Sequence, residues 1–432
     1  MLSSPLPGLL ITAVGIPLLG IVSIGVSRSE GLIDLSGRVS KIFCRLFTCA
    51  LYLTIGPLFA IPRCGATSFT IGAVPFAGEN IWLPQLIFTA LFLGAVLFFT
   101  LRPSKILDSL GKFLNPAFLI FLGILLLTAL MRPVNRISEV PPMGNYADSA
   151  FFTGFLQGYD TLDALASLAF GIIVIRAIRT LGVSEPGAVA GSAIQAGVIS
   201  TALMALVYGV TAVVGAQSYT LYAGRLADPG FNGGDAFAII ARHYFSRGGN
   251  LILAVTVTLC CVKTAIGLVT ACGETFLRLF PGKLSYRSWA LVFTGTSLLI
   301  SNIGLSQIIA LAGLVPYFLC PLDIVLILLG LLGNWFGRAR IVYQWAMGAA
   351  LAAAVLELAR VTGGSFRPFV EWAGGWLPLY SYGLGWIAPS AIGFALGLLL
   401  RRRGAAGKPR KPGNLTEPRP AFPAGTEAME EA

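Results

Sequence analysis

A glycine and four polar residues interrupt an otherwise apolar stretch at residues 155–171. They are Gly158, Tyr159, Asp160, Thr161 and Asp163, and a clean apolar run follows them. This pattern is typical of a membrane helix that unwinds near the middle of the bilayer, where two half-helix ends expose amides and carbonyls that can hold a carboxylate and a cation. The same residues also fit a loop in which Asp160 or Thr161 caps a helix that begins near Leu162.

A second polar group lies inside the apolar stretch at residues 250–277. Lys263 stands in the middle of this stretch, where an ammonium must reach the membrane surface or find a partner. The hydroxyl of the adjacent Thr264 could ligate sodium, although threonines in helices also bond to their own backbone. A third polar stretch, residues 301–313, predicts a tight turn between two helices rather than a ligand site.

Motifs for enzymatic chemistry are missing from the sequence. The chain has one histidine, His243, and contains no H-E-x-x-H, no G-x-S-x-G and no glycine-rich phosphate loop. A protease that uses paired aspartates would need them on two helices, whereas Asp160 and Asp163 share one short stretch. We therefore predict that the protein is not an enzyme and that it uses no cofactor.

These polar groups lie within a chain that is 56% hydrophobic and only 11% charged, against about 25% charged for a soluble domain. About eleven apolar segments come close to the roughly 20 residues that a membrane-spanning helix needs. Prolines predict bends at Pro57 and Pro62 and again at Pro316 and Pro321. The fold class predicted is an all-α membrane protein, with segments at residues 8–26, 41–62, 85–101, 113–131, 155–175, 187–216, 250–277, 288–304, 305–333, 341–359 and 383–400.

The basic residues, which give a net charge of +11, are scattered over the loops rather than massed on one polar domain, so nucleic acid is not an expected partner. Leaving Arg63 aside, they concentrate on every second loop, which the positive-inside rule assigns to the cytoplasm. The C-terminus is then cytoplasmic, in a multi-pass protein of the cell (inner) membrane. The lipid bilayer is the expected surrounding, and no obligate protein partner is evident.

The two ends of the chain differ in character from its middle. We expect residues 1–402 to form one membrane domain and residues 403–432, which are rich in Pro, Gly and charge, to form a disordered cytoplasmic tail. An odd number of spans with a cytoplasmic C-terminus places Met1 outside, with no signal peptide before the first apolar segment. This suggests that an earlier span is missing from the sequence.

Several motifs resemble those of the branched-chain amino acid:cation symporters of bacteria. The resemblance starts from GPLFAIPR at residues 56–63, followed by TSF at residues 67–69. It continues in the same order through LITAVGIPLL at 10–19, GYDTLDAL at 158–165, FGIIV at 170–174, KTAIGL at 263–268, CGE at 272–274, LSYRS at 284–288 and SNIGLSQ at 301–307.

The resemblance implies a fold and a function. The fold would be the leucine-transporter type, with twelve helices of which ten form two inverted repeats and the first and sixth are broken. The function would be import of leucine, isoleucine and valine, coupled to sodium, by alternating access. The similarity begins inside the family's second helix, so about eleven helices are expected here, with the first one absent.

The resemblance also suggests residue roles. The unwound part of the family's sixth helix falls at Gly158, Tyr159, Asp160, Thr161 and Asp163, the expected substrate site. Its sodium ligand on the eighth helix falls at Thr264. Lys263 stands where an apolar residue is usual, and its ammonium could substitute for sodium and make transport proton-dependent. An exporter or carrier of other small apolar amino acids, and a truncated membrane protein that does not transport, stay open.

Overall fold

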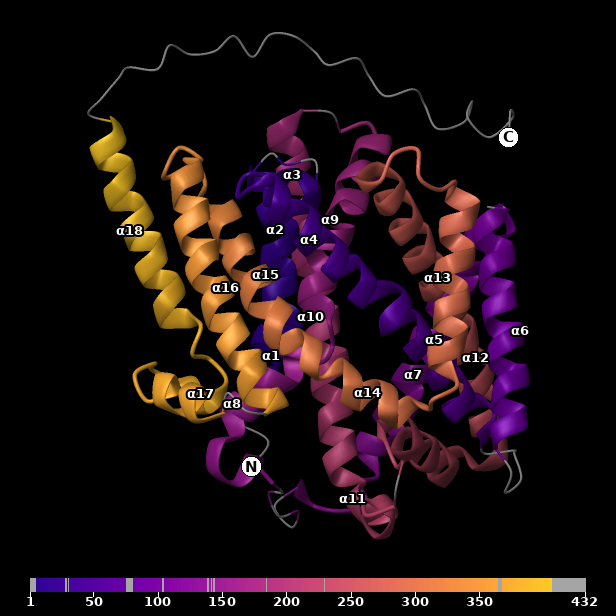
Figure 1. Cartoon of the computed structure of the whole chain (residues 1–432). Coiled ribbons are helices and arrows are strands. Elements are labelled where there is room, and N and C mark those ends of the chain that lie inside the picture. The colour runs from indigo at the N-terminus through magenta and orange to yellow at the C-terminus, as the bar shows by residue number, and fades with distance from the viewer. Residues whose placement is uncertain are drawn as a thin grey trace.

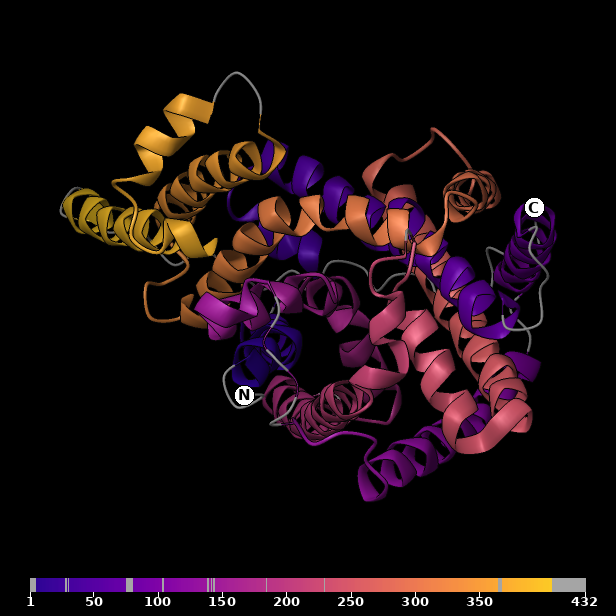
Figure 2. The ribbon, with the colours of Figure 1, turned by 90° about the horizontal axis from the view of Figure 1, so that it is seen from below.

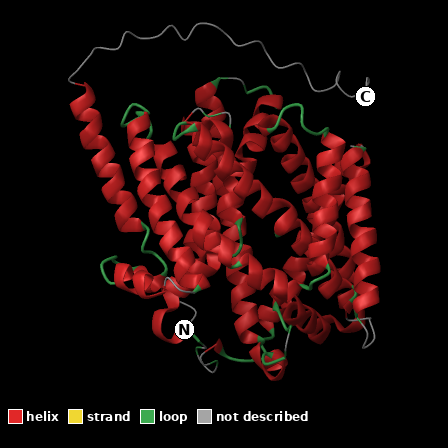
Figure 3. Ribbon diagram, viewed as in Figure 1, coloured by secondary structure: helices red, strands yellow, loops and turns green. Residues whose placement is uncertain are grey.

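The structure is a computed structural model that describes residues 5–27, 29, 31–74, 81–102, 105–137, 140, 142, 144–183, 185–228, 230–363 and 367–405. Within these ranges every regular element is a helix (Figure 3), which confirms the prediction of an all-α protein. The last helix continues to Ala405. From residue 406 onward, the predicted disordered tail lies outside the described residues.

The first half of the chain forms ten α-helices and two π-helical turns. In order, they are α1 (Pro5–Leu10), a π-turn (Ile11–Gly15), α2 (Ile16–Ser27), α3 (Leu32–Gly37), α4 (Lys41–Leu53), a second π-turn (Thr54–Leu58), α5 (Ala60–Gly72), α6 (Trp82–Leu101), α7 (Lys105–Met131), α8 (Tyr146–Tyr159), α9 (Asp163–Thr180) and α10 (Pro186–Gln217).

The second half continues in the same way. Its elements are α11 (Tyr219–Tyr222), a 3-10 turn (Ala223–Arg225), α12 (Gly233–Leu279), α13 (Tyr286–Ser301), α14 (Leu305–Ala312), α15 (Leu314–Leu332), α16 (Arg340–Thr362), α17 (Arg367–Gly374), a further 3-10 turn (Tyr380–Tyr382) and α18 (Ile387–Ala405). Helix α12 is interrupted at Ser246, whose φ of 55° is not helical.

The described helices include seven that are long and apolar enough to cross a bilayer, and α13 with α14 forms an eighth that is bent by 111°. Shorter apolar helices cover residues 116–131 and 387–401. Together with the pair α8 and α9, these helices overlap all eleven predicted segments, but the segment predicted at 305–333 is divided between α14, which belongs to the bent pair, and α15. The 111° bend follows the predicted turn, where Gly304 has a positive φ of 97°.

Proline interrupts two spans, as predicted at Pro57 and Pro316, whereas Pro62 and Pro321 lie within the continuous helices α5 and α15. Between α4 and α5, Gly56 has φ −107° and ψ −118°, beside Pro57, which has no N–H to donate. The Ser297 hydroxyl of α13 donates to the Pro57 carbonyl at 3.3 Å, so a neighbouring helix satisfies a carbonyl at this break. Helices α14 and α15 separate at Gly313 because Pro316 offers no N–H to the carbonyl of Ala312.

Helix α2 packs tightly between α9 and α15. A Cβ added to Gly20 would lie 1.9 Å from the Ser167 hydroxyl of α9, and one added to Gly330 of α15 would lie 2.1 Å from the Ser23 hydroxyl. Ser23 also donates to the carbonyl of Ile327 at 2.9 Å. Seen from below, the N-terminal helix lies beside the magenta helices of the middle of the chain (Figure 2), against which α1 and α2 pack.

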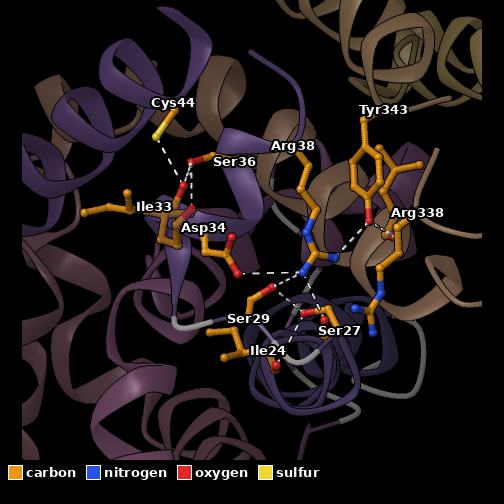
Figure 4. Close-up of polar contacts among 12 residues, drawn as sticks. Ile24, Ser27, Ser29, Ile33, Asp34, Ser36, Arg38, Cys44, Arg338 and Tyr343 are labelled. Atoms are coloured by element: carbon orange, nitrogen blue, oxygen red, sulfur yellow. Dashed lines mark hydrogen bonds and ion pairs between the residues drawn. The ribbon is translucent and has the colours of Figure 1, made fainter. Parts of the chain in front are cut away.

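One edge of the molecule carries α3 and the C-terminal end of α18, whereas the N-terminus, α8, α11 and α17 lie at the opposite edge (Figure 1). At the α3 edge, Arg38 joins several elements (Figure 4). Its guanidinium donates to the Ser27 carbonyl at 3.0 Å, to the Ser29 hydroxyl at 2.8 Å and to the Tyr343 hydroxyl at 3.3 Å. Tyr343 in turn donates to the Leu329 carbonyl, so the α2–α3 connection is tied to α15 and α16.

The close crossing of α1 and α8 gives a stability prediction. A Cβ at Gly154 would lie 2.0 Å from the Pro5 carbonyl oxygen, so Gly154→Ala forces the backbones apart. We expect the free energy of unfolding to fall by about 1–3 kcal/mol, as for other overpacked interiors. The measurement is thermal unfolding in detergent. Gly209→Ala on α10 is the control, because nothing lies within 4 Å of its added Cβ; equal melting temperatures for the two variants would contradict the prediction.

Candidate functional site

The predicted break between two half-helices is present at residues 160–162. Helix α8 ends at Tyr159 and α9 begins at Asp163. Leu162 has φ 63° and ψ 8°, a left-handed conformation that is uncommon for a bulky residue. The non-helical stretch is shorter than the predicted residues 158–163, because Gly158 and Tyr159 are still helical. The alternative prediction was a helix that begins near Leu162, and α9 begins one residue later, at Asp163.

Gly158 allows the N-terminal helix to approach α8. A Cβ at this position would lie 1.7 Å from the Thr12 hydroxyl. Thr12 belongs to the first π-turn and donates to the carbonyl of Phe155 at 2.8 Å. A larger residue at position 158 would push away the helix that covers the break, so the role of this glycine is close packing.

The polar side chains at the break differ in how well they are satisfied. The Thr161 hydroxyl donates to the Gly158 carbonyl at 2.9 Å and accepts the Asp163 amide at 3.4 Å. The Asp163 carboxylate accepts the Tyr208 hydroxyl of α10 at 2.6 Å. In contrast, the Oδ1 atom of Asp160 is buried and has no hydrogen-bond partner among the described residues. Asp160 is therefore the member of this set that can accept a donor from a ligand.

Arg63 is part of the break, although the sequence reasoning set it aside. It lies on α5 and donates from Nη1 to the backbone carbonyl of Asp160 at 3.0 Å. The signal that could have found it was present in the sequence, since Arg63 is the one cation inside the 41–72 apolar helix pair that no loop accounts for. A guanidinium inside a span needs a partner, and here the partner is a carbonyl freed by the broken helix.

Opposite charges face each other across the break. The C-terminal end of α8 carries the negative end of a helix dipole, and the N-terminal end of α9 carries the positive end. Arg63 adds a cation and Asp160 adds a carboxylate at the same place. An arrangement of this kind suits a zwitterion, because a carboxylate is attracted to the amides and the guanidinium while an ammonium is attracted to the carbonyls and Asp160.

Tyr159 lies on the inner side of the break and is only 1% exposed. Its ring contacts Phe155 and Tyr317 edge to face, with centroids 5.6 and 6.5 Å away. Its hydroxyl has no hydrogen-bond partner among the described residues. The predicted site residue Tyr159 therefore combines an apolar ring surface with a free polar group next to Asp160.

The predicted sodium ligand and the predicted coupling lysine lie side by side on α12, and both are exposed. The Thr264 hydroxyl donates to the Cys260 carbonyl at 3.0 Å, the back-bonding pattern that was the alternative. In the described part of the chain, no hydrogen bond or ion pair joins either residue to the break. The described residues also contain no group of three or more His, Cys, Asp or Glu side chains that could hold a metal ion.

Helix α5 lies between these two places. Arg63 bonds to the break, and the neighbouring Cys64 has its thiol against that of Cys261 on α12. Cys261 is one helical turn from Thr264. The predicted substrate residues at the break and the pair Lys263 and Thr264 are therefore connected through α5 and are not in direct contact.

A polar cavity of about 310 Å³ lies further along α5, beyond the break. It is lined by α5, α6, the connection before α12 and the start of α14. Its charged lining includes Arg225 and Asp228, which form an ion pair at 3.2 Å. Asp235 also lines it and caps α12 by accepting the Asn232 amide.

A helical membrane bundle with a charged break inside one of its helices defines the molecule as a multi-pass membrane transport protein. Comparison with known families makes this specific: residues 2–403 match the family described as "Branched-chain amino acid transport protein", and the chain belongs to it. Members of this family are transport carriers and not enzymes.

Individual relatives agree with the family assignment. The chain is 46% identical to the branched-chain amino acid permease BrnQ of Lactobacillus delbrueckii subsp. lactis, over 90% of this chain and 87% of the relative. It is 37% identical to the permease BraB of Bacillus subtilis, over 91% and 86%. It is also 37% identical to the branched-chain amino acid transport system 2 carrier protein of Pseudomonas aeruginosa, over 94% and 89%.

The Tyr208–Asp163 contact gives a prediction that does not depend on transport. Tyr208→Phe removes the donor and leaves a half-buried carboxylate oxygen without its partner, so the free energy of unfolding should fall by about 1 kcal/mol. The measurement is again thermal unfolding in detergent. Tyr382→Phe is the control, because Tyr382 is 40% exposed and its ring stacks on Phe152. A Tyr208→Phe protein as stable as this control would show that the bond is dispensable.

Proposed function

We propose that this protein is a secondary active transporter that imports leucine, isoleucine and valine across the cell (inner) membrane by alternating access. One observation carries the proposal: the α8–α9 break holds Arg63 on a freed carbonyl beside the unpartnered carboxylate of Asp160. This site offers a place for both charged ends of an amino acid inside the bundle. The names of the relatives supply the substrate class.

The proposed substrate site consists of the predicted residues with Arg63 added. The substrate carboxylate lies toward Arg63 and the first turn of α9, and its ammonium lies toward Asp160 and the last turn of α8. The side chain gains about 0.8 kcal/mol for each buried methylene. Since one methylene discriminates by only about 1–3 kcal/mol, one carrier accepts leucine, isoleucine and valine.

The remaining parts of the proposal concern topology. The helices follow the leucine-transporter plan of two inverted repeats. The edge with α3 and the end of α18 faces the cytoplasm, because the loops that the positive-inside rule assigns to that side include Arg38, Lys41 and Arg45. The polar cavity near Arg225 then lies on the outer side, where it gives solutes a hydrated approach to α5.

Sodium is the proposed coupling ion. The Thr264 hydroxyl and the Cys260 carbonyl place two oxygen atoms 3.0 Å apart on an exposed face of α12, and oxygen is the ligand atom that sodium takes in such carriers. Lys263, the residue before Thr264 on α12, favours a second candidate, in which its ammonium replaces sodium. It has no hydrogen bond or ion pair in the described structure and lies one turn beyond the exposed Leu259.

The proposed function is tested by counterflow of labelled leucine into proteoliposomes loaded with leucine. We expect uptake that isoleucine and valine inhibit and that lysine and glutamate do not. Arg63→Gln should raise the half-saturating leucine concentration about ten- to hundredfold, since a hydrogen bond to a charged group contributes about 1.5–3 kcal/mol. Arg102→Gln, which removes an exposed arginine above the Phe98 ring, is the control.

Three outcomes of this test are informative. Absence of counterflow in the native protein refutes transport. Equal affinities in the Arg63 and Arg102 variants would remove Arg63 from the site. Carriers of one orientation are blocked from outside the vesicle by a membrane-impermeant thiol-reactive reagent or an antibody. The direction in which net movement then follows the ion gradient distinguishes an importer from an exporter.

The coupling ion is tested by replacing sodium with choline. We expect leucine uptake to require sodium, and Thr264→Ala to raise the half-saturating sodium concentration about tenfold, while Thr264→Ser keeps the hydroxyl and stays near native. Lys263→Ala distinguishes the second candidate. If the native protein transports leucine in choline and Lys263→Ala transports only in sodium, the lysine replaces the ion and the sodium proposal is wrong.

A further inference from the structure

Asp323 is a carboxylic acid in the interior of a membrane span, away from the substrate site proposed above. It lies in α15, between Leu322 and Ile324, and is fully buried. Neither of its oxygen atoms has a hydrogen-bond partner among the described residues. The apolar cluster around it includes its neighbours on α15 and residues of α2, α9 and α16.

An ionised carboxylate without a partner is very costly in such surroundings. Water, a cation or a donor would stabilise the charge, and no described residue forms a hydrogen bond with either oxygen of Asp323. The neutral acid is therefore the form that this conformation accepts. A carboxyl group that must hold a proton in one conformation binds and releases that proton when the conformation changes.

Most titratable groups on the helices packed against α15 are paired with other groups, and Arg179 of α9 and Tyr146 and Asp148 of α8 are exposed. Helix α2 contributes none, and α14 contributes none. On the other helices, the ion pairs and hydrogen bonds join Glu357 to Arg360, Asp163 to Tyr208, Tyr343 to the carbonyl of Leu329, and Asp34 to Arg38. Arg340 of α16 donates to the carbonyl of Val39.

A few side chains connect Asp323 to the break between α8 and α9. The thiol of Cys320, one turn earlier on α15, interacts electrostatically with both Asp323 and Asp160. It also interacts with the Tyr159 hydroxyl, which lies near the indole of Trp386. One turn later, the Ile327 carbonyl accepts the Ser23 hydroxyl of α2. Movement of α15 against α2 and the break therefore changes the surroundings of Asp323.

We propose that Asp323 is a proton-binding site linked to the transport cycle. The carboxyl takes a proton from water on one side of the membrane, carries it while buried as in this structure, and returns it to water when α15 moves and the other side opens. This inference rests on the proposed function. The site is separate from the oxygen pair at Thr264, so the proton and sodium dependences can be measured independently.

The test compares two measurements in proteoliposomes at fixed sodium concentration on both sides. Leucine counterflow measures transport without an ion gradient, and leucine accumulation under an imposed pH gradient measures proton linkage. With one proton per leucine, the native protein should accumulate leucine by up to about tenfold for each pH unit. Asp323→Asn, which mimics the protonated acid, should exchange leucine but accumulate none in response to the pH gradient.

Two further variants make the comparison specific. Asp148→Asn, an exposed carboxylate at the start of α8, should accumulate leucine as the native protein does. Asp323→Leu removes the polar group from the apolar cluster, and should melt at a higher temperature than the native protein while also losing the response to the pH gradient. This variant keeps the test decisive if Asp323→Asn fails to fold.

The proposal is overturned if native accumulation ignores the pH gradient, or if Asp323→Asn responds to it like the native protein. Failure of the proposed function is a different result, namely no counterflow in the native protein. In that case the infrared C=O stretching band of a protonated carboxylic acid decides. Its presence in the native protein and loss in Asp323→Asn supports a protonated Asp323, and its absence from the native protein overturns the inference.

Discussion

A helix that stops inside an apolar bundle leaves backbone amides and carbonyls that only protein groups can satisfy, and this constraint determines much of the structure. At the α8–α9 break, the Arg63 guanidinium donates a hydrogen bond to the Asp160 carbonyl, and the Thr161 hydroxyl donates one to the Gly158 carbonyl. At the α4–α5 break, the Ser297 hydroxyl takes the Pro57 carbonyl. In each case the donor is a side chain placed there by the fold. These donors offset the free-energy cost of breaking helical hydrogen bonds within the membrane. They also bring polar side chains to the break.

Close contact between helices is the second requirement, because each donor must reach a carbonyl on another helix. Thr12 reaches the Phe155 carbonyl only because residue 158 is a glycine, and Ser23 reaches the Ile327 carbonyl beside Gly330. Small residues therefore do more than increase packing density. They set the distance at which one helix satisfies the backbone of the next, so the polar contacts and the glycines depend on each other.

The sequence predicts much of the fold and less of the site. Long apolar segments, proline and a glycine before polar residues are local signals, and they predicted the spans, the bends and the break near Asp160. The unwound stretch is shorter than predicted because Gly158 and Tyr159 remain in α8. Arg63 and Asp323 belong to segments whose local pattern is simply apolar. Their roles depend on which helix lies opposite, and spacing along one segment carries no information about that.

Asp163, which is half-buried, and Asp323, which is fully buried, illustrate how neighbours decide what a carboxyl group does. The Asp163 carboxylate accepts a hydrogen bond from the Tyr208 hydroxyl, so it forms part of a structural contact between α9 and α10. Asp323 has no hydrogen-bond partner among the described residues, and an apolar residue of similar size would fill its place at lower cost. If Asp323 binds and releases a proton during transport, as proposed above, its charged form is stabilised in another conformation. Since α15 packs against both α2 and α9, a movement of α15 that hydrates Asp323, as proposed above, would also shift helices next to the break.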